Sequence, residues 1–201
     1  MKKILFTLTC VTLVYMSYAQ TVSGTKAIGG GINYTSESGL SGYEGDDGKQ
    51  TDFSIMPTFG YFVSDNVMVG VAVGYLSSKS ENLNFYDEET TGFVVGPLAR
   101  YYVHTTNESF AFYGQFTALF ISGKTSYDGV DDETKSGGLD ISISPGFAYF
   151  LNEHWALELG FRGIAYTKED PDKDADDDEQ TTFTLGLNSF MPATIGFRYH
   201  F

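Results

Sequence analysis

The sequence predicts an all-β fold: an eight-stranded antiparallel up-and-down barrel whose strands span a membrane. Three observations lead to this fold class. Eight segments alternate residue by residue between large apolar side chains and small or polar ones, and this period of two is typical of β-strands. The connections between the segments alternate strictly between short turns and long acidic loops. A short sequence pattern also recurs in the second, fourth and sixth segments, just before a short turn.

Each predicted strand has one face that suits contact with lipid and one face that suits a narrow barrel interior. In the third segment Val69, Val71 and Val73 share a face, whereas Met68 and Ala72 share the other. A soluble barrel would need a charged outer face, whereas here the polar face offers mainly small side chains, which suit the lumen of eight strands. A closed barrel is also the sheet that satisfies all its backbone groups in lipid. The expected segments are 26–37, 51–63, 67–79, 91–104, 110–124, 139–151, 155–168 and 182–201.

The connections place the acidic residues at one end of the barrel. Short turns are expected at 64–66, 105–109 and 152–154, and long loops at 38–50, 80–90, 125–138 and 169–181. Nearly all of the 26 acidic residues fall in or beside the long loops; the exceptions are Asp65, Glu108, Asp140, Glu153 and Glu158. The formal net charge of -14, with only 12 scattered basic residues, argues against nucleic acid as a partner, because phosphate contacts need clustered Lys and Arg.

The recurring pattern has the form proline, three residues, tyrosine, aromatic, aliphatic. It occurs as "PTFGYFV" from Pro57, "PLARYYV" from Pro97 and "PGFAYFL" from Pro145. Each copy runs into a short turn, so the repeating unit is a two-strand hairpin. Proline cannot donate a ladder hydrogen bond, and we therefore expect a β-bulge at each of these positions.

Residues 1–19 are predicted to be a secretory signal, which leaves 20–201 as the barrel domain. Lys2 and Lys3 precede an apolar stretch, and Ser17-Tyr18-Ala19 has the small-x-small form of a cleavage site. The stretch is shorter than the roughly 18 residues of a spanning helix. Cys10, the only cysteine, lies within it, so we expect no disulfide and no cysteine metal site in the mature chain.

The chain resembles the small eight-stranded outer-membrane barrels. The features that carry the resemblance are the hairpin ends "GYF", "RYY" and "AYF" and the terminal "IGFRYHF". The chain is similar to outer membrane proteins X and W, and more closely to the outer membrane protein beta-barrel domain type common in Bacteroidota. The resemblance implies the outer membrane of a Gram-negative bacterium, with short periplasmic turns, long extracellular loops, and lipid and lipopolysaccharide as surroundings. It also implies that Phe197, Tyr199 and Phe201 are read by the outer-membrane assembly machinery.

Alternation places one cluster of charged side chains on the lumen face. Its members are Arg100, Glu158, Arg162 and Arg198. The cluster could form an anion path or selectivity filter. We favour a packed polar plug, because a barrel of eight strands leaves space only for side chains.

A second candidate site is the acidic segment "EDPDKDADDDEQ". It spaces carboxylates as a calcium loop does, at Asp170, Asp172, Asp174 and Asp176. It departs from that pattern at Ala175, where the loop needs Gly, and it lacks the closing Glu. The alternatives are a weak Ca²⁺ site and a solvated acidic loop, and the composition favours the loop. No other cofactor is expected.

These features favour a structural or surface-interaction role with an occluded lumen. The alternative is porin-like passive passage of small or hydrophobic solutes, for which Leu76, Leu98 and Ile164 are weak lumen candidates. A lipid A-modifying enzyme is less favoured, because all three histidines fall at the short-turn end, far from the outer leaflet where such sites lie. We therefore predict that the protein is not an enzyme; its extracellular ligand is not specified by the sequence.

Overall fold

The computed structural model describes residues 21–41, 47–81, 87–107, 109–129, 133–173, 179–185 and 194–201. Ten strands form one antiparallel sheet that closes on itself. Their bounds are β1 Lys26–Ser41, β2 Asp47–Ser64, β3 Val67–Glu81, β4 Glu88–His104, β5 Phe110–Tyr127, β6 Glu133–Phe150, β7 Trp155–Gly160, β8 Ile164–Asp170, β9 Gln180–Leu185 and β10 Thr194–His200. No helix in these ranges is long and apolar enough to cross a membrane.

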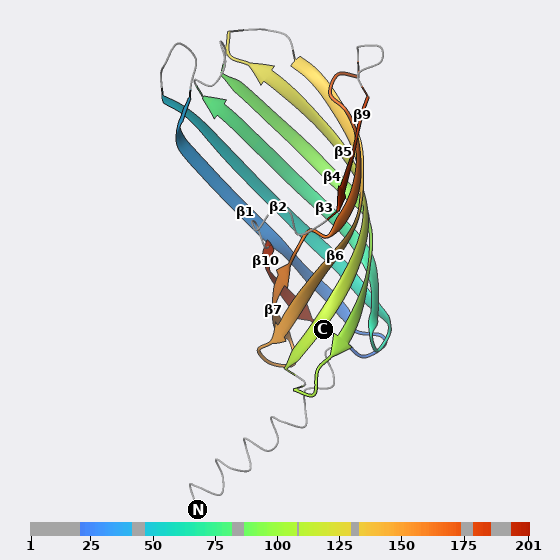
Figure 1. Cartoon of the computed structure of the whole chain (residues 1–201). Helices are drawn as coiled ribbons and strands as arrows, with labels where there is room; N and C mark the ends of the chain where they lie inside the picture. Colours follow the sequence, from blue (N-terminus) through green and yellow to red (C-terminus); the bar gives the residue numbers. More distant parts are fainter. Residues whose placement is uncertain are drawn as a thin grey trace, which may run out of the picture.

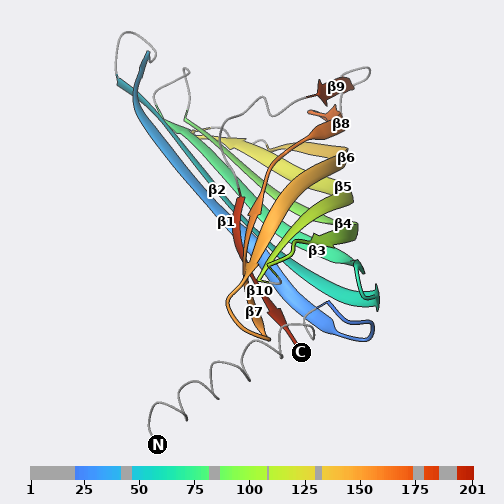
Figure 2. The same cartoon turned by 60° about the horizontal axis from the view of Figure 1, so that its bottom comes forward.

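The predicted eight-stranded antiparallel barrel is confirmed. The strands β1 to β6 pair in sequence order, β6 pairs with β7, and β10 lies between β7 and β1 to complete the ring. The seventh and eighth predicted segments are each divided in two, since β8 continues after β7 beside β6, and β9 pairs with β8. Figures 1 and 2 show the barrel narrow where β7 and β10 close it and wide at the opposite end.

Alternating burial turns one face of each strand toward the barrel interior and the other face outward. On β3, Met68 and Ala72 are buried, whereas Val69, Val71 and Val73 are each about two-fifths exposed. The same alternation extends around the barrel, so the outer surface carries a band of exposed Val, Ile, Phe and Tyr. A surface of this kind suits lipid rather than water.

The strands extend further toward the long loops than the sequence predicts. The sixth segment, expected from residue 139, begins at Glu133, and the first, expected to end at residue 37, ends at Ser41. Apart from Leu40, the two extensions carry polar residues or glycine on both faces, so they lack the apolar alternation that identified the other strand residues. Backbone pairing nevertheless continues through them, for example between Lys124 and Lys135.

The three prolines of the repeat disturb the ladders less than expected. The register is the same before and after Pro57 in its pairing with β3, and before and after Pro97 in its pairing with β5. The predicted bulges at these two positions are therefore wrong. Near Pro145 the ladder does shift by one residue, because Ile143 pairs with Ile164 whereas Gly146 pairs with Gly160.

Candidate functional site: the barrel lumen

A layer of apolar and aromatic side chains fills the narrow end of the lumen. Phe62, Met68, Tyr102, Phe150 and His200 are all buried there. The Phe62 ring lies 5.6 Å from Tyr102 and 5.9 Å from His200, and the Phe150 ring lies 5.9 Å from His200 (centroid distances). Because these residues come from strands all around the ring, their rings meet across the interior. We call these five residues the plug layer.

Next to the plug layer, one carboxylate binds two guanidinium groups. Arg100 Nη1 donates to Glu158 Oε1 at 2.5 Å, and Arg198 donates to the same oxygen through Nε at 2.7 Å and to Oε2 through Nη2 at 3.2 Å. The three side chains are at most 7 % exposed. Arg100 belongs to β4 and Glu158 to β7, which are not neighbours in the sheet, so this interaction spans the lumen. We call the three residues the ion network.

Further contacts fix both guanidinium groups. The Arg100 guanidinium carbon lies 4.0 Å from the centre of the Tyr113 ring, a distance typical of a cation–π contact. Arg198 Nη2 also donates to Thr58 Oγ1 at 3.3 Å. The Arg198 side chain crosses the backbone at Gly29, where an added Cβ would lie only 3.1 Å from its guanidinium carbon. The same Cβ would lie 2.8 Å from the backbone oxygen of Phe197, so any larger residue here would force β10 or the Arg198 side chain to shift.

Arg162, the fourth predicted member of the cluster, lies apart from the other three. Its side chain is 50 % exposed, and its Nη2 donates to Asp140 Oδ2. Asp140 is buried and also accepts a hydrogen bond from Thr167 Oγ1 at 2.9 Å. Asp140 is not among the predicted cluster residues; it and Ser142, two residues along β6, are both buried on the inner face of the strand.

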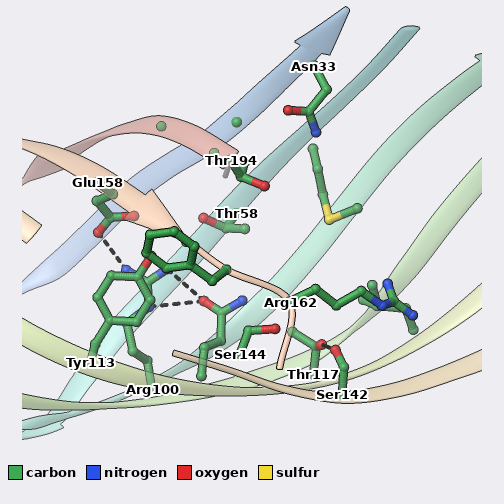
Figure 3. Close-up of a pocket in the computed structure, with 18 of the residues that line it drawn as sticks. Asn33, Thr58, Arg100, Tyr113, Thr117, Ser142, Ser144, Glu158, Arg162 and Thr194 are labelled. Atoms are coloured by element: carbon green, nitrogen blue, oxygen red, sulfur yellow. Dashed lines mark hydrogen bonds and ion pairs between the residues drawn. The ribbon is translucent and has the colours of Figure 1, made fainter. Parts of the chain in front are cut away.

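A cavity of about 350 Å³ occupies the lumen between the ion network and the Arg162–Asp140 pair. Figure 3 shows Glu158, Arg100 and Tyr113 together at one end of it, with Arg162 away from them. The rest of its wall is mainly uncharged and hydrogen-bonding, with residues Asn33, Ser54, Thr58, Gln115, Thr117, Ser142, Ser144 and Thr194. Apolar side chains also contribute to the wall, namely Met56, Leu119 and Phe161. The cavity therefore combines hydrogen-bonding groups with apolar surface, and on the side of the ion network it ends against salt-bridged side chains.

The predicted calcium residues lie at the long-loop end, and the structure describes only two of them. Asp170 is the last residue of β8 and Asp172 follows it. Asp174 and Asp176 lie outside the described residues. The described part of the chain contains no group of three or more acidic, histidine or cysteine side chains placed to hold a metal ion.

The predicted assembly signal occupies the outer face of β10. Phe197 and Phe201 are 56 % and 61 % exposed, and the Tyr199 ring packs 5.0 Å from Trp155 and 6.0 Å from Phe201. Phe201 also exchanges two backbone hydrogen bonds of 2.9 Å with Lys26. The last strand is thus tied to the first, and its aromatic side chains line the outer surface at the closure.

Comparison with known proteins identifies the family. Residues 6–189 match the model of the family described as outer membrane protein beta-barrel domain. Among solved structures, the Neisserial surface protein A covers 89 % of this chain and 98 % of its own length at 18 % identity, with a TM-score of 0.51.

Two further outer-membrane proteins match over a similar share of the chain. OprG from Pseudomonas aeruginosa covers 91 % of this chain and 98 % of its own at 18 % identity and a TM-score of 0.48. Ail from Yersinia pestis covers 90 % and 100 % at 14 % identity and a TM-score of 0.43. No curated protein matches the chain. The family match covers most of the sequence, and the chain therefore belongs to the outer membrane protein beta-barrel domain family, a group of β-barrels in the outer membrane of Gram-negative bacteria.

Proposed function

We propose that the protein is a barrel with an occluded lumen whose role is structural or surface-interacting, rather than a pore. The observation that supports this most is the pair of successive layers at the narrow end, the plug layer and the ion network. Phe62 and Met68 are completely buried, and Arg198 and His200 are 1 % exposed. A solute following the lumen would have to displace both layers. Breaking a buried ion pair alone typically costs about 3 to 5 kcal/mol.

The surface for interaction is then the long-loop end. The strands extend there as polar ribbons that carry exposed ion pairs, such as Lys124–Glu133 at 2.9 Å and Lys168–Glu179 at 2.7 Å. Most of the acidic residues of the sequence also fall at this end. With these loops outside the cell, divalent cations would bridge their carboxylates to the phosphates of lipopolysaccharide, which is the partner that we propose.

The alternative, passive passage of small or hydrophobic solutes, has less support. Leu98 is buried in the packed interior, and Ile164 is 42 % exposed on the outer side, so neither lines an open path. Leu76 does line an upper pocket of about 290 Å³. A solute could therefore enter from the loop end, but it would meet the ion network below.

We also propose that the role is not enzymatic. His104 and His200 pack against the Phe150 ring at the short-turn end, and His154 contacts the backbone of His200 there. A base for acyl transfer has to lie within hydrogen-bond reach of its substrate. With the short turns in the periplasm, the histidines would lie at the wrong end for chemistry on the outer leaflet.

Conductance across planar bilayers tests the closed lumen. The refolded barrel should give no steady current, whereas the triple variant Phe62→Ala, Phe150→Ala and Glu158→Ala should show conducting events, because it removes two rings of the plug layer and the carboxylate that joins the arginines of the ion network. That variant controls for insertion of the barrel and for detection. A large, ohmic current from the unmodified protein would overturn the proposal and support the transport alternative.

A further inference from the structure

The wall of the lumen cavity carries an uneven charge. Its ionisable residues are three arginines, Arg100, Arg162 and Arg198, and two carboxylates, Asp140 and Glu158, so the wall has a net charge of +1. Arg162 and Asp140 form one pair, which leaves two guanidinium groups sharing Glu158. This surplus charge lies at the buried end of the cavity, where screening by water and salt is weakest.

Gln115 has a fixed orientation beside this surplus charge. Its Oε1 accepts hydrogen bonds from Arg100 Nε at 3.0 Å and from Arg100 Nη2 at 2.6 Å. Arg100 can only donate, so these two bonds determine which end of the amide faces the guanidinium. The Nε2 group must then point elsewhere, and it has no acceptor among the residues that the structure describes. Gln115 lines the cavity.

The neighbouring side chains add hydroxyl donors. Ser144 and Thr194 line the cavity, and neither hydroxyl has a partner within the described ranges. The Thr117 and Ser142 hydroxyls are 2.8 Å apart; one of them donates to the other, and the hydrogen of the second remains available. The cavity therefore combines oriented N–H and O–H donors with a positive surplus. An anion would accept hydrogen bonds from these donors and balance the positive charge.

We propose that the lumen cavity is a binding site for a small monovalent anion, held by the Nε2 group of Gln115 and the surrounding hydroxyls. The single surplus charge matches a monoanion, and the volume of about 350 Å³ leaves room for a small carboxylate as well as a halide. The anion completes the charge balance of the ion network. Its binding needs no open pore and does not rest on the proposed function.

The upper pocket limits access to the site. It adjoins the cavity at Asn33 and Ser54 and contains Asp52, whose carboxylate accepts a hydrogen bond from Ser78 Oγ at 2.6 Å. An anion entering from the loop end passes this carboxylate. Multivalent anions are repelled there more strongly than monovalent ones, which is consistent with a site for a single negative charge.

NMR of the refolded, ¹⁵N-labelled barrel in detergent micelles tests the proposal. Sodium acetate and sodium chloride are titrated separately in a zwitterionic buffer, and the side-chain amide of Gln115 is compared with that of Gln180, which is exposed at the start of β9. The Gln115 signal should shift and saturate, whereas the Gln180 signal reports ionic strength alone. A stronger response to acetate identifies a carboxylate site, and equal responses identify a general monoanion site.

Two matched variants complete the test. Gln115→Glu keeps an acceptor for Arg100 but removes the donors and cancels the surplus charge, so anion affinity followed at the Ser142 backbone amide should fall at least about tenfold. Gln180→Glu makes the same chemical change outside the cavity and should leave the affinity unchanged. The proposal is overturned if the Gln115 and Gln180 side-chain signals shift alike without saturation. It is also overturned if the Gln115→Glu variant binds the anion with the affinity of the unmodified protein. Bilayer conductance is measured separately, so the closed lumen and the anion site can fail independently.

Discussion

Replacing Glu158 by Ala should destabilise the barrel strongly without opening it. The substitution leaves the Arg100 and Arg198 guanidinium groups buried with no carboxylate between them. Hydrogen bonds to charged groups contribute about 1.5 to 3 kcal/mol each, and Glu158 accepts one such bond from Arg100 and two from Arg198. Bonds that share partners do not add up, so we take the loss expected when a buried pair is broken, about 3 to 5 kcal/mol. We expect a decrease of that size in the free energy of unfolding.

Urea unfolding of the refolded barrel in lipid vesicles measures this decrease. Trp155, the only tryptophan, lies on the outer face of β7 against Tyr199 and reports opening at the closure by fluorescence. The matched control is Glu133→Ala, which removes an ion pair whose side chains are 56 % and 50 % exposed and should cost less than about 1 kcal/mol. Glu158→Gln keeps the size of the side chain and separates the effect of charge from that of volume.

The outcome has two independent parts. Conductance of the Glu158→Ala barrel should stay negligible, because Phe62, Met68 and the rest of the plug layer are unchanged. A free energy of unfolding within about 1 kcal/mol of the unmodified protein, the range of an exposed pair, would refute the reasoning. It would mean that water in the cavity stabilises the two guanidinium groups as effectively as the Glu158 carboxylate does.

Three further predictions concern other parts of the molecule. Unboiled and boiled samples should migrate differently in detergent gels, and deletion of Phe201 should slow membrane assembly more than it lowers the stability of the folded barrel; equal effects on both would contradict a role in assembly. Calcium should bind weakly at the long-loop end, with a Kd of about 10⁻⁴ to 10⁻³ M, and identical calorimetric heats after changing Asp172, Asp174 and Asp176 to Asn would exclude a specific site. Gly30→Ala should cost about 1 to 3 kcal/mol in urea unfolding, because Gly30 has a φ of 150° and closely approaches a backbone carbonyl of β2; an unchanged midpoint would show that the backbone relaxes there.

The fold could be predicted from the sequence because lipid and lumen impose opposite demands on alternate residues. This signal holds only where one face contacts lipid. Above the apolar band, in Glu133 to Gly138 for example, both faces are polar, and the strand continues by backbone pairing alone. The strand ends at the long-loop side could therefore not be located, whereas the short-turn ends were located within a residue or two.

The same parity argument explains which lumen residues were found. Counting by twos along the seventh segment places Glu158 inside, and the structure agrees. The count fails across residues 161–163, where the strand is interrupted, because a shift of one residue exchanges the two faces. In β8 the buried position is Ala165, and Ile164 faces outward. Arg162 still lines the lumen cavity with the other three charged residues, but its salt-bridge partner is Asp140 on β6, which alternation along the seventh segment cannot identify.

The closing strand β10 shows why alternation is so strict at the end of the chain. Its outward residues, Phe197 and Tyr199, form the aromatic surface of the closure, while its inward residues, Arg198 and His200, belong to the ion network and the plug layer. The two sets cannot exchange faces. An outward guanidinium would face lipid without the Glu158 carboxylate, and an inward phenyl ring at position 198 could not bind that carboxylate. The two faces should therefore respond to mutation in different ways. Outward changes should act on assembly into the membrane, and inward changes on the stability of the closed barrel, although the affected residues are adjacent in sequence.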